Sequence, residues 1–409
     1  MQAAAISLQF WMASSGPAID CLTQKTEEWN NSQDQYKVII TNTPGPENFA
    51  KPARDALALS AEQQPTFVLA PEYMTSQLGS SKKIIPVADI LDQSQLENIA
   101  LLVQRTFGDE KGRALSLPLN PACGILYTNK ALMEKAGRER DFVPRTMEEL
   151  EEVCNKLFEL NLVENGYTCA WPAAYLVEVP AAQQNMALAL PDNGFSGKGT
   201  YQLSSQWFYN HLMGIREQVK SRIFVYAGQT NDAKIPFINQ QVAFYMQGST
   251  HLVPLQKEAK FEIGYGALPT LEKGQKEKYA FPLGGASIWV MDNEQTKLAV
   301  AGVRKFLEYL AGNDVQKALH EQAASVPVSA TLPATIREFY NTHPLHKAVV
   351  EQTIEAKVGE FSRGIRMPNY GTDRKALFNL IEKIVNVKAT KDEEVLPLLQ
   401  EFDATYSNN

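Results

Sequence analysis

Four short segments carry groups suited to holding a small polar ligand, and each adjoins a predicted strand. These are Glu72 after the strand Thr66–Ala70, Trp171 at the end of Tyr167–Trp171, Ser249 and Thr250 after Val242–Met246, and Gly284-Gly285 in Leu283–Met291. In open α/β sheets, ligands bind beyond the carboxyl ends of the strands, where the next helix presents free N–H groups. The sequence therefore predicts a binding protein.

Motifs for catalysis are absent from the sequence. The chain has no P-loop, dinucleotide-binding glycine motif, zinc-protease helix or nucleophile elbow. His343 and His346 are three apart, but we expect Pro344 to break the helix that would aim them together, which predicts a surface turn. The acidic run Glu148-Glu149-Glu151-Glu152 favours an exposed first helical turn. We predict no catalytic residue, metal or cofactor.

The elements that position these segments alternate between strand and helix, which predicts mainly parallel sheets. The predicted order begins Ile6–Met12 strand, Pro17–Asn31 helix, Tyr36–Thr41 strand, Phe49–Leu59 helix and Thr66–Ala70 strand. After two short extended runs near residues 112–128 come helices at Met147–Leu160, Ala181–Leu190 and Gln206–Gln218, and strands at Tyr167–Trp171, Val242–Met246, Phe261–Ala267 and Leu283–Met291. The charged run 272–278 predicts a loop, and 294–400 is mostly helical.

Composition excludes several classes of protein. The 409 residues are 44% hydrophobic, so the chain can bury the cores of two or three domains. With 39 basic and 46 acidic side chains and no basic stripe, neither nucleic acid nor an anionic membrane is an expected partner. No apolar run is long enough to cross a bilayer. Cys154 and Cys169 are equally compatible with a disulfide and with buried free thiols.

Several blocks resemble the extracellular solute-binding proteins of ABC importers. They include Tyr127-Thr128-Asn129-Lys130, Gly284-Gly285-Ala286-Ser287-Ile288-Trp289-Val290-Met291, Val326-Pro327-Val328 and Gly364-Ile365-Arg366, in this order. The stretch Gly359–Met367, together with Gly166-Tyr167 leading to Trp171 and Asn193-Gly194-Phe195, is similar to the glycerol-3-phosphate-binding branch. The resemblance extends from about residue 6 to residue 400.

The resemblance implies a fold and a domain organisation. We expect an α/β fold of the type II periplasmic binding protein kind, in which two discontinuous lobes with mixed sheets flanked by helices are joined by crossing segments and close over one ligand. Lobe 1 would comprise residues 1–116 and 276–326, and lobe 2 residues 117–275 and 327–409. A signal peptide would have been removed, and the protein would be periplasmic and monomeric.

The resemblance also implies ligand contacts. Glu72 matches the acid that accepts hydrogen bonds from the glycerol hydroxyls, and Trp171 matches an aromatic wall. Ser249, with Thr250 beside it, matches a hydroxyl donor, and Gly285, with Gly284 beside it, a backbone donor. Arg366 matches the guanidinium that binds the phosphate as a fork. Phe49, Ser14 and Ser325 complete the predicted set.

At other positions this chain departs from the branch. Pro121 and Ala122 stand where the branch has a serine, and Ser325 stands where it has a tyrosine. A further tyrosine is Phe49 or Asn48 here, and a second tryptophan is replaced by Ala174 or Tyr175. Fewer hydroxyl donors should weaken binding of a doubly charged monoester more than binding of a diester. We therefore expect glycerophosphodiesters such as glycerophosphocholine to bind at least as well as glycerol-3-phosphate.

The sequence accordingly favours a non-enzymatic subunit that captures a phosphorylated glycerol derivative and delivers it to the transmembrane permease of an ABC importer, without inserting into the membrane itself. Three alternatives remain at this point. The chain could bind a neutral sugar or oligosaccharide in the same fold, act as an enzyme on glycerophosphate, or serve as a signalling or adhesion module that has lost its ligand.

Overall fold

The computed structural model describes residues 5–45, 49–271 and 279–407. The predictions for Asn48 and for the charged run 272–278 lie outside the described residues. The chain divides into two compact units: unit 1 is Met1–Ala122 with Leu283–Val350, and unit 2 is Cys123–Pro282 with Glu351–Asn409. The boundaries differ from the expected ones, most of all for residues 327–350, which belong to unit 1.

Unit 1 contains a mixed six-stranded sheet. Its strand order is β2-β1-β3-β12-β4, with β5 paired to β12. The strands are β1 (Ile6–Met12), β2 (Tyr36–Asn42), β3 (Phe67–Pro71), β4 (Ile84–Ile85), β5 (Leu117–Pro118) and β12 (Ala286–Met291). The helices are α1 (Pro17–Asn31), α2 (Lys51–Ala58), η1 (Ala61–Gln63), η2 (Glu72–Met74), α3 (Thr75–Gly79), η3 (Val87–Asp89), α4 (Gln93–Glu97), α5 (Leu101–Phe107), α12 (Glu294–Leu298), α13 (Val300–Ala311), α14 (Asn313–Ala323), α15 (Leu332–Thr335), η7 (Arg337–Asn341) and α16 (Pro344–Thr353), which runs three residues past the unit boundary.

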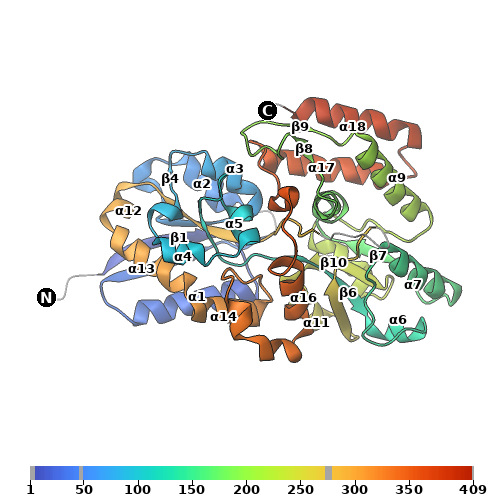
Figure 1. Cartoon of the computed structure of the whole chain (residues 1–409), viewed down its shortest axis with the longest axis horizontal. Coiled ribbons are helices and arrows are strands. Elements are labelled where there is room, and N and C mark those ends of the chain that lie inside the picture. The colour runs from blue at the N-terminus through green and yellow to red at the C-terminus, as the bar shows by residue number, and fades with distance from the viewer. Residues whose placement is uncertain (1–4, 46–48, 272–278, 408–409) are drawn as a thin grey trace. The chain divides into compact units, whose positions relative to one another are not determined.

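Aromatic side chains join the sheet of unit 1 to its helices. The ring of Phe67 lies 5.7 Å from Phe10 on the neighbouring strand and 5.5 Å from Phe306 on α13. Trp29 of α1 meets the same Phe306 ring at 5.1 Å. Burial of each such side chain contributes about 1.5–3 kcal/mol. This core holds residues from both stretches of unit 1 together, and α1 packs beside α14 (Figure 1).

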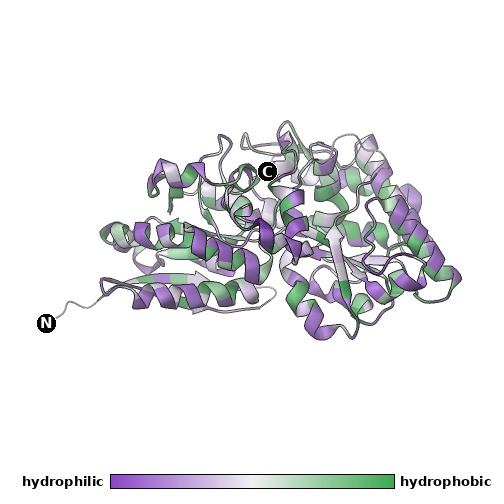
Figure 2. Ribbon diagram, turned by 60° about the horizontal axis from the view of Figure 1, so that its bottom comes forward, coloured by the Kyte–Doolittle hydropathy of each residue, from purple (hydrophilic) through white to green (hydrophobic). Residues whose placement is uncertain are grey.

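Unit 2 contains a mixed four-stranded sheet, in the order β11-β6-β10-β7, and a separate β8-β9 hairpin. The strands are β6 (Gly124–Asn129), β7 (Tyr167–Cys169), β8 (Ala189–Leu190), β9 (Thr200–Tyr201), β10 (Phe244–Gly248) and β11 (Ile263–Ala267). The helices are α6 (Lys130–Lys135), α7 (Met147–Glu159), the π-helix η4 (Ala174–Glu178), α8 (Val179–Gln183), α9 (Gln206–Lys220), η5 (Asn231–Lys234), α10 (Ile235–Ile238), η6 (Ser249–His251), α11 (Leu252–Glu258), η8 (Glu360–Arg363), α17 (Tyr370–Val385) and α18 (Asp392–Tyr406). Two mixed sheets flanked by helices are the predicted fold class. Hydrophobic and hydrophilic residues alternate along the helices, as Figure 2 shows, which is the pattern expected of helices that cover a sheet with one face.

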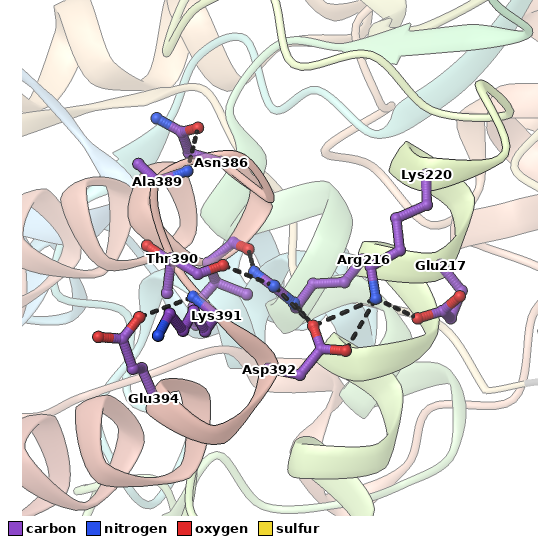
Figure 3. Close-up of polar contacts among 10 residues, drawn as sticks. Arg216, Glu217, Lys220, Asn386, Ala389, Thr390, Lys391, Asp392 and Glu394 are labelled. Carbon is purple, nitrogen blue, oxygen red and sulfur yellow. Dashed lines mark hydrogen bonds and ion pairs between the residues drawn. The ribbon is translucent and has the colours of Figure 1, made fainter.

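A buried arginine fixes the C-terminal helices of unit 2. Arg216 of α9 is 1% exposed. It donates to Asp392 Oδ1 at 2.7 Å and to the carbonyl oxygens of Thr390 and Ile384 (Figure 3). Lys220, one turn further along α9, donates to the other carboxylate oxygen of Asp392 at 2.8 Å. These hydrogen bonds hold the connection between α17 and α18 against α9.

Two local predictions were wrong. The helix expected at Ala181–Leu190 ends at Gln183, and Ala189–Leu190 forms β8 instead. The chain turns out of the helix at Asn185, whose φ of 53° is left-handed. Asparagine adopts this conformation at lower cost than most residues, so it commonly ends helices.

Pro344 does not break a helix but starts one, because proline is well tolerated at the first helical position. The ring of His343 therefore lies 5.5 Å from that of His346, and His346 lies 5.1 Å from His320 on α14. His346 is buried and contacts the carbonyl oxygen of Glu321. The predicted surface turn is thus a cluster that packs α16 on α14, and this packing places residues 327–350 in unit 1.

All four cysteines are buried free thiols, so the alternative of a disulfide between Cys154 and Cys169 is not realised. Among the residues described, no helix combines the length and apolarity needed to span a membrane. The same part of the chain has no group of three or more His, Cys, Asp or Glu side chains placed to hold a metal ion.

Candidate ligand-binding residues

Most of the ligand residues predicted in unit 1 gather at one edge of its sheet. Strands β1, β2 and β3 are parallel, so their carboxyl ends share an edge. Strand β12 is antiparallel to β3, with Ala286 opposite Pro71, so its amino end reaches the same edge. The predicted residues here are Ser14 after β1, Phe49 after β2, Glu72 after β3, and Gly284 and Gly285 before β12. Five residues separated by up to 271 positions in the sequence are therefore brought to one edge.

Gly285 is the tightest point of this edge. Its carbonyl oxygen accepts the backbone N–H of Glu72 at 3.1 Å. Its φ of +100° is left-handed, and a Cβ atom added there would lie 2.3 Å from the carbonyl oxygen of Asn120. Only glycine fits both constraints. Pro121 in turn accepts the N–H of Val326 at 2.6 Å, so the loop after β5 and the segment after α14 adjoin this edge.

The other edge residues have different surroundings. Glu72 is half-buried and is the first residue of η2. The backbone N–H of Ser14 donates to Asn42 Oδ1 at 3.1 Å, and Asn42 Nδ2 donates to the carbonyl oxygen of Ser14 at 2.9 Å. These two hydrogen bonds fix the loop after β1 to the end of β2. Phe49 is half-buried against the hydrophobic core of unit 1. Its ring therefore has a structural role in addition to the predicted contact with ligand.

Ser325 offers a buried hydroxyl. The residue is 1% exposed, and its Oγ atom has no hydrogen-bond partner among the described residues. Its carbonyl oxygen accepts from His320 Nδ1 at 2.6 Å, while His320 Nε2 lies 3.1 Å from the Tyr340 hydroxyl. Burial lowers the pKa of His320 to about 4, so the ring is neutral at pH 7. A buried hydroxyl without a partner is costly, which makes Ser325 a candidate for a ligand contact.

In unit 2, Trp171 follows β7 in a strained conformation. Its φ is 48°, which is uncommon for a bulky residue. Its backbone N–H donates to Gln229, and its carbonyl oxygen accepts from Ala174 and Tyr175 at the start of η4. Its indole Nε1 donates to Gln247 Oε1 at 3.0 Å. Strained residues cluster at functional sites, where the surrounding structure fixes them.

Gln247 orients the indole. This side chain is 1% exposed and uses all of its hydrogen-bonding capacity. Its Oε1 accepts from Trp171 and from the N–H of Gly248, and its Nε2 donates to Asn231 and Tyr245, all at 2.9–3.0 Å. The sequence analysis missed Gln247. The available signal was one amide in an otherwise apolar or aromatic buried strand.

Ser249 and Thr250 follow β10, which is parallel to β7. They therefore lie at the same sheet edge as Trp171. Neither side chain caps the helix, because Gly248 is the N-cap of η6. Ser249 is fully buried, and its hydroxyl faces the Cys123 thiol, whose pKa burial raises to about 12. Thr250 is half-buried in the first turn.

Arg366 belongs to a loop that is fastened to Asn193. The Arg366 N–H donates to the Asn193 carbonyl oxygen at 2.7 Å, and Asn193 Nδ2 donates to Gly364 O at 3.2 Å. Asn193 Oδ1 also accepts the N–H groups of Leu188 and Ala189. The guanidinium carbon of Arg366 lies 5.1 Å from the ring centroid of Phe195. Two of the three motifs that resemble the glycerophosphate branch, Gly359–Met367 and Asn193-Gly194-Phe195, are thus in direct contact.

A buried ion pair connects the Trp171 and Arg366 segments. Glu178, the last residue of η4, accepts from Arg374 Nε at 2.9 Å and from the Tyr370 hydroxyl at 2.5 Å. Both side chains of the pair are nearly buried, at 8% and 11% exposure. Because η4 follows Trp171 and α17 follows Arg366, the pair fixes these segments relative to each other. No sequence pattern indicates that these two charges, 196 positions apart, form a pair.

A cavity of about 780 Å³ lies elsewhere in unit 2, and none of the predicted ligand residues lines it. Its walls include Leu176 of η4 and Trp207 and His211 of α9. His211 donates to the carbonyl oxygen of Leu176 at 2.7 Å, and burial lowers the pKa of His211, which keeps the ring neutral. This contact supports η4, and therefore Trp171, from α9.

Curated relatives with a similar sequence are periplasmic sn-glycerol-3-phosphate-binding proteins named UgpB. That of Rhizobium meliloti (strain 1021) is 27% identical over 396 residues, covering 94% of this chain and 90% of the relative. That of Shigella dysenteriae serotype 1 is 25% identical over 401 residues, covering 95% and 90%. The similarity therefore spans nearly the whole of both chains.

Solved structures share the fold at lower identity. The cyclic α-maltosyl-1,6-maltose-binding protein of Arthrobacter globiformis aligns with a TM-score of 0.78 at 19% identity, covering 99% of this chain and 100% of that one. UgpB of Mycobacterium tuberculosis, solved with glycerophosphocholine, aligns with a TM-score of 0.76 at 15% identity, covering 99% of this chain and 98% of that one. The fold is thus that of the α/β periplasmic binding proteins.

The family model described as bacterial extracellular solute-binding protein matches residues 27–348. Proteins of this kind bind a small molecule for an ABC importer and are not enzymes. Because this match covers most of its length, this chain belongs to the bacterial extracellular solute-binding proteins.

Proposed function

We propose that the chain captures glycerol-3-phosphate or a glycerophosphodiester such as glycerophosphocholine and delivers it to the permease of an ABC importer in the periplasm. The observation that carries the proposal is the arrangement in unit 2. A guanidinium, Arg366, sits on a loop fastened to Asn193, and a buried ion pair ties the helix after that loop to the helix after Trp171. The ligands of the UgpB relatives, glycerol-3-phosphate and glycerophosphocholine, support the same ligand class.

The proposed roles follow from the chemistry of each group. Arg366 presents parallel N–H donors that match two phosphate oxygens. Trp171 presents an indole face to the C–H groups of the glycerol chain, and Gln247 holds that face in place. Glu72, at the edge of unit 1, accepts hydrogen bonds from the glycerol hydroxyls. We propose Ser14, Phe49, Gly284, Gly285, Ser325, Ser249 and Thr250 as additional contacts with the ligand.

We further propose that the diester binds at least as well as the monoester. Pro121 and Ala122 carry no side-chain donor, and Phe49 has no hydroxyl, so these described positions offer a dianion fewer donors than the branch does. The buried Ser325 hydroxyl, which has no partner among the described residues, replaces only one of them. A diester carries one charge fewer than a fully ionised monoester, so missing donors should reduce its binding free energy less.

A second candidate ligand is a neutral oligosaccharide, because a maltose-type binder shares the fold at a TM-score of 0.78. The two candidates differ in what they require of Arg366. A phosphate needs the guanidinium charge, whereas a neutral sugar needs mainly aromatic surface and hydrogen-bonding groups.

Isothermal titration calorimetry tests the proposal with glycerol-3-phosphate, glycerophosphocholine and maltose as ligands. We expect both phosphorylated ligands to bind, maltose to give no heat, and Arg366→Gln to weaken phosphate binding at least 100-fold, about 2.7 kcal/mol. Arg337→Gln, an exposed arginine in η7, is the matched control and should bind as wild type does. Binding of maltose alone, or unchanged phosphate affinity in Arg366→Gln, would contradict the proposal. Size-exclusion chromatography of the same samples should show a monomer.

A further inference from the structure

Two guanidinium groups share one aromatic ring in unit 2. The guanidinium carbon of Arg363 lies 3.7 Å from the ring centroid of Phe195, and that of Arg366 lies 5.1 Å from the same centroid. Phe195 is 8% exposed. A cation over the face of an aromatic ring is attracted by the negative charge of that face. One buried ring therefore anchors both positive groups.

The backbone around this ring is fixed on both sides. Asn193 binds the arginine loop through its carbonyl oxygen and its side-chain amide, at 2.7 and 3.2 Å. Gly194 has a φ of +86°, and a Cβ atom there would lie 2.5 Å from the backbone nitrogen of Met367. The close approach permits only glycine at position 194. The segment that carries Phe195 and the loop that carries both arginines thus form one rigid assembly.

The two arginines contact the ring at different distances. Arg363 lies at stacking distance from the ring, whereas Arg366 is further away and its Nη1 contacts the carbonyl oxygen of Ile365 at 3.1 Å. Stacking leaves the N–H edge of a guanidinium available to an anion, because the ring occupies its face and not its edge. The contact with Phe195 is therefore compatible with hydrogen bonds from the edge of Arg363 to a phosphate.

We propose that Arg363 is a second guanidinium of the phosphate site and that Phe195 is the positioning residue for both arginines. The inference rests on the proposed function and adds to it the residues that determine charge selectivity. Two cations on one ring favour the more highly charged anion. Arg363 should thus contribute more to binding of the glycerol-3-phosphate dianion than to binding of the singly charged diester, and it compensates in part for the donors missing at the unit 1 edge.

The test uses Phe195→Leu, Phe195→Tyr and Arg363→Gln, titrated with glycerol-3-phosphate and glycerophosphocholine. We expect Phe195→Leu to lose about tenfold in affinity for the monoester, and Phe195→Tyr, which restores an aromatic face, to recover it. Arg363→Gln should lower the affinity for the monoester by a factor at least five times larger than the factor for the diester. In wild type, affinity for the monoester should rise as the pH increases through the second phosphate pKa, near 6. This rise should be smaller in Arg363→Gln, and monoester affinity should also depend less on salt concentration in this variant.

Matched controls come from the same unit. Arg222 stacks on Phe158 with the guanidinium carbon 4.7 Å from the ring centroid, in a pair that has no part in the proposed site. Phe158→Leu and Arg222→Gln should leave both affinities unchanged, and circular dichroism should show every variant folded at the assay temperature. If wild type binds ligand but Phe195→Leu matches it, or Arg363→Gln weakens both ligands equally, this inference is wrong and the proposed function stands. If wild type binds neither phosphorylated ligand, the proposed function is wrong as well.

Discussion

Removal of one member of the Glu178–Arg374 pair should destabilise unit 2 strongly. Arg374→Met leaves the Glu178 carboxylate 8% exposed, with Tyr370 as its remaining donor among the contacts described above. Breaking a buried ion pair by removing one partner costs about 3–5 kcal/mol, because the other charge remains buried. A loss of this size is a large fraction of the stability of a typical domain.

Replacing the whole cluster should cost far less than removing one charge. A Glu178→Met, Tyr370→Phe, Arg374→Met triple variant removes both charges and the hydroxyl of this cluster together, and we expect a stability within roughly 2 kcal/mol of wild type. The binding readout separates the two roles of the pair. Because the pair fixes the Trp171 segment relative to the Arg366 segment, glycerophosphate affinity should fall in both variants, even where stability is restored.

Urea denaturation followed by circular dichroism measures the stability change, and calorimetric titration measures the affinity. The matched control is Arg138→Met, which removes an ion pair to Glu152 whose side chains are 38% and 52% exposed, and it should lose less than about 1 kcal/mol. If Arg374→Met is no less stable than this control, the ion pair does not support unit 2 as argued. If the triple variant binds ligand as wild type does, the pair does not position the two segments.

Three further predictions concern other parts of the molecule. The Cβ atom of Gly285→Ala would lie 2.3 Å from the carbonyl oxygen of Asn120, at a left-handed φ. This variant should lose more than about 1 kcal/mol of unfolding free energy in thermal denaturation and should bind ligand more weakly. An unchanged melting temperature would contradict the close approach. Burial lowers the pKa values of His320 and His346 to about 4, so the unfolded chain takes up these protons first as pH falls below about 6.5. The free energy of unfolding should therefore be highest above that pH and should fall by on the order of 2–3 kcal/mol per ring between pH 6.5 and pH 4. The His320→Gln variant should show a smaller fall when unfolding is measured by differential scanning calorimetry. Arg216→Met leaves three backbone and carboxylate acceptors without this donor (Figure 3), and hydrogen exchange should accelerate in α17 and α18 relative to α7; equal exchange rates in all three helices would contradict this role.

Local patterns predicted the elements that depend on neighbouring residues. The helix expected at Pro17–Asn31 is α1, and its Ile19, Leu22 and Trp29, which lie three and seven residues apart, are all buried in the core of unit 1. The helix expected at Met147–Leu160 is α7, and Thr146 caps it by accepting the N–H of Glu149 at 3.1 Å. Patterns failed where a single residue type has two possible effects. Pro344 was expected to end a helix and starts one, because the penalty for proline applies to helix interiors and not to the first position.

The amino-acid sequence by itself determined the class of protein, the strand ends at which the proposed ligand residues lie, and the motifs around Trp171 and Arg366. Alternation, caps and short motifs can be read from residues that are close together in the sequence. Only the tertiary structure decided the contacts between distant residues: Glu178 with Arg374, Gln247 with Trp171, Phe195 with Arg363, and His320 with His346. The physical reason is that a buried charge or amide is stable only with a partner, and packing in three dimensions selects that partner from anywhere along the chain.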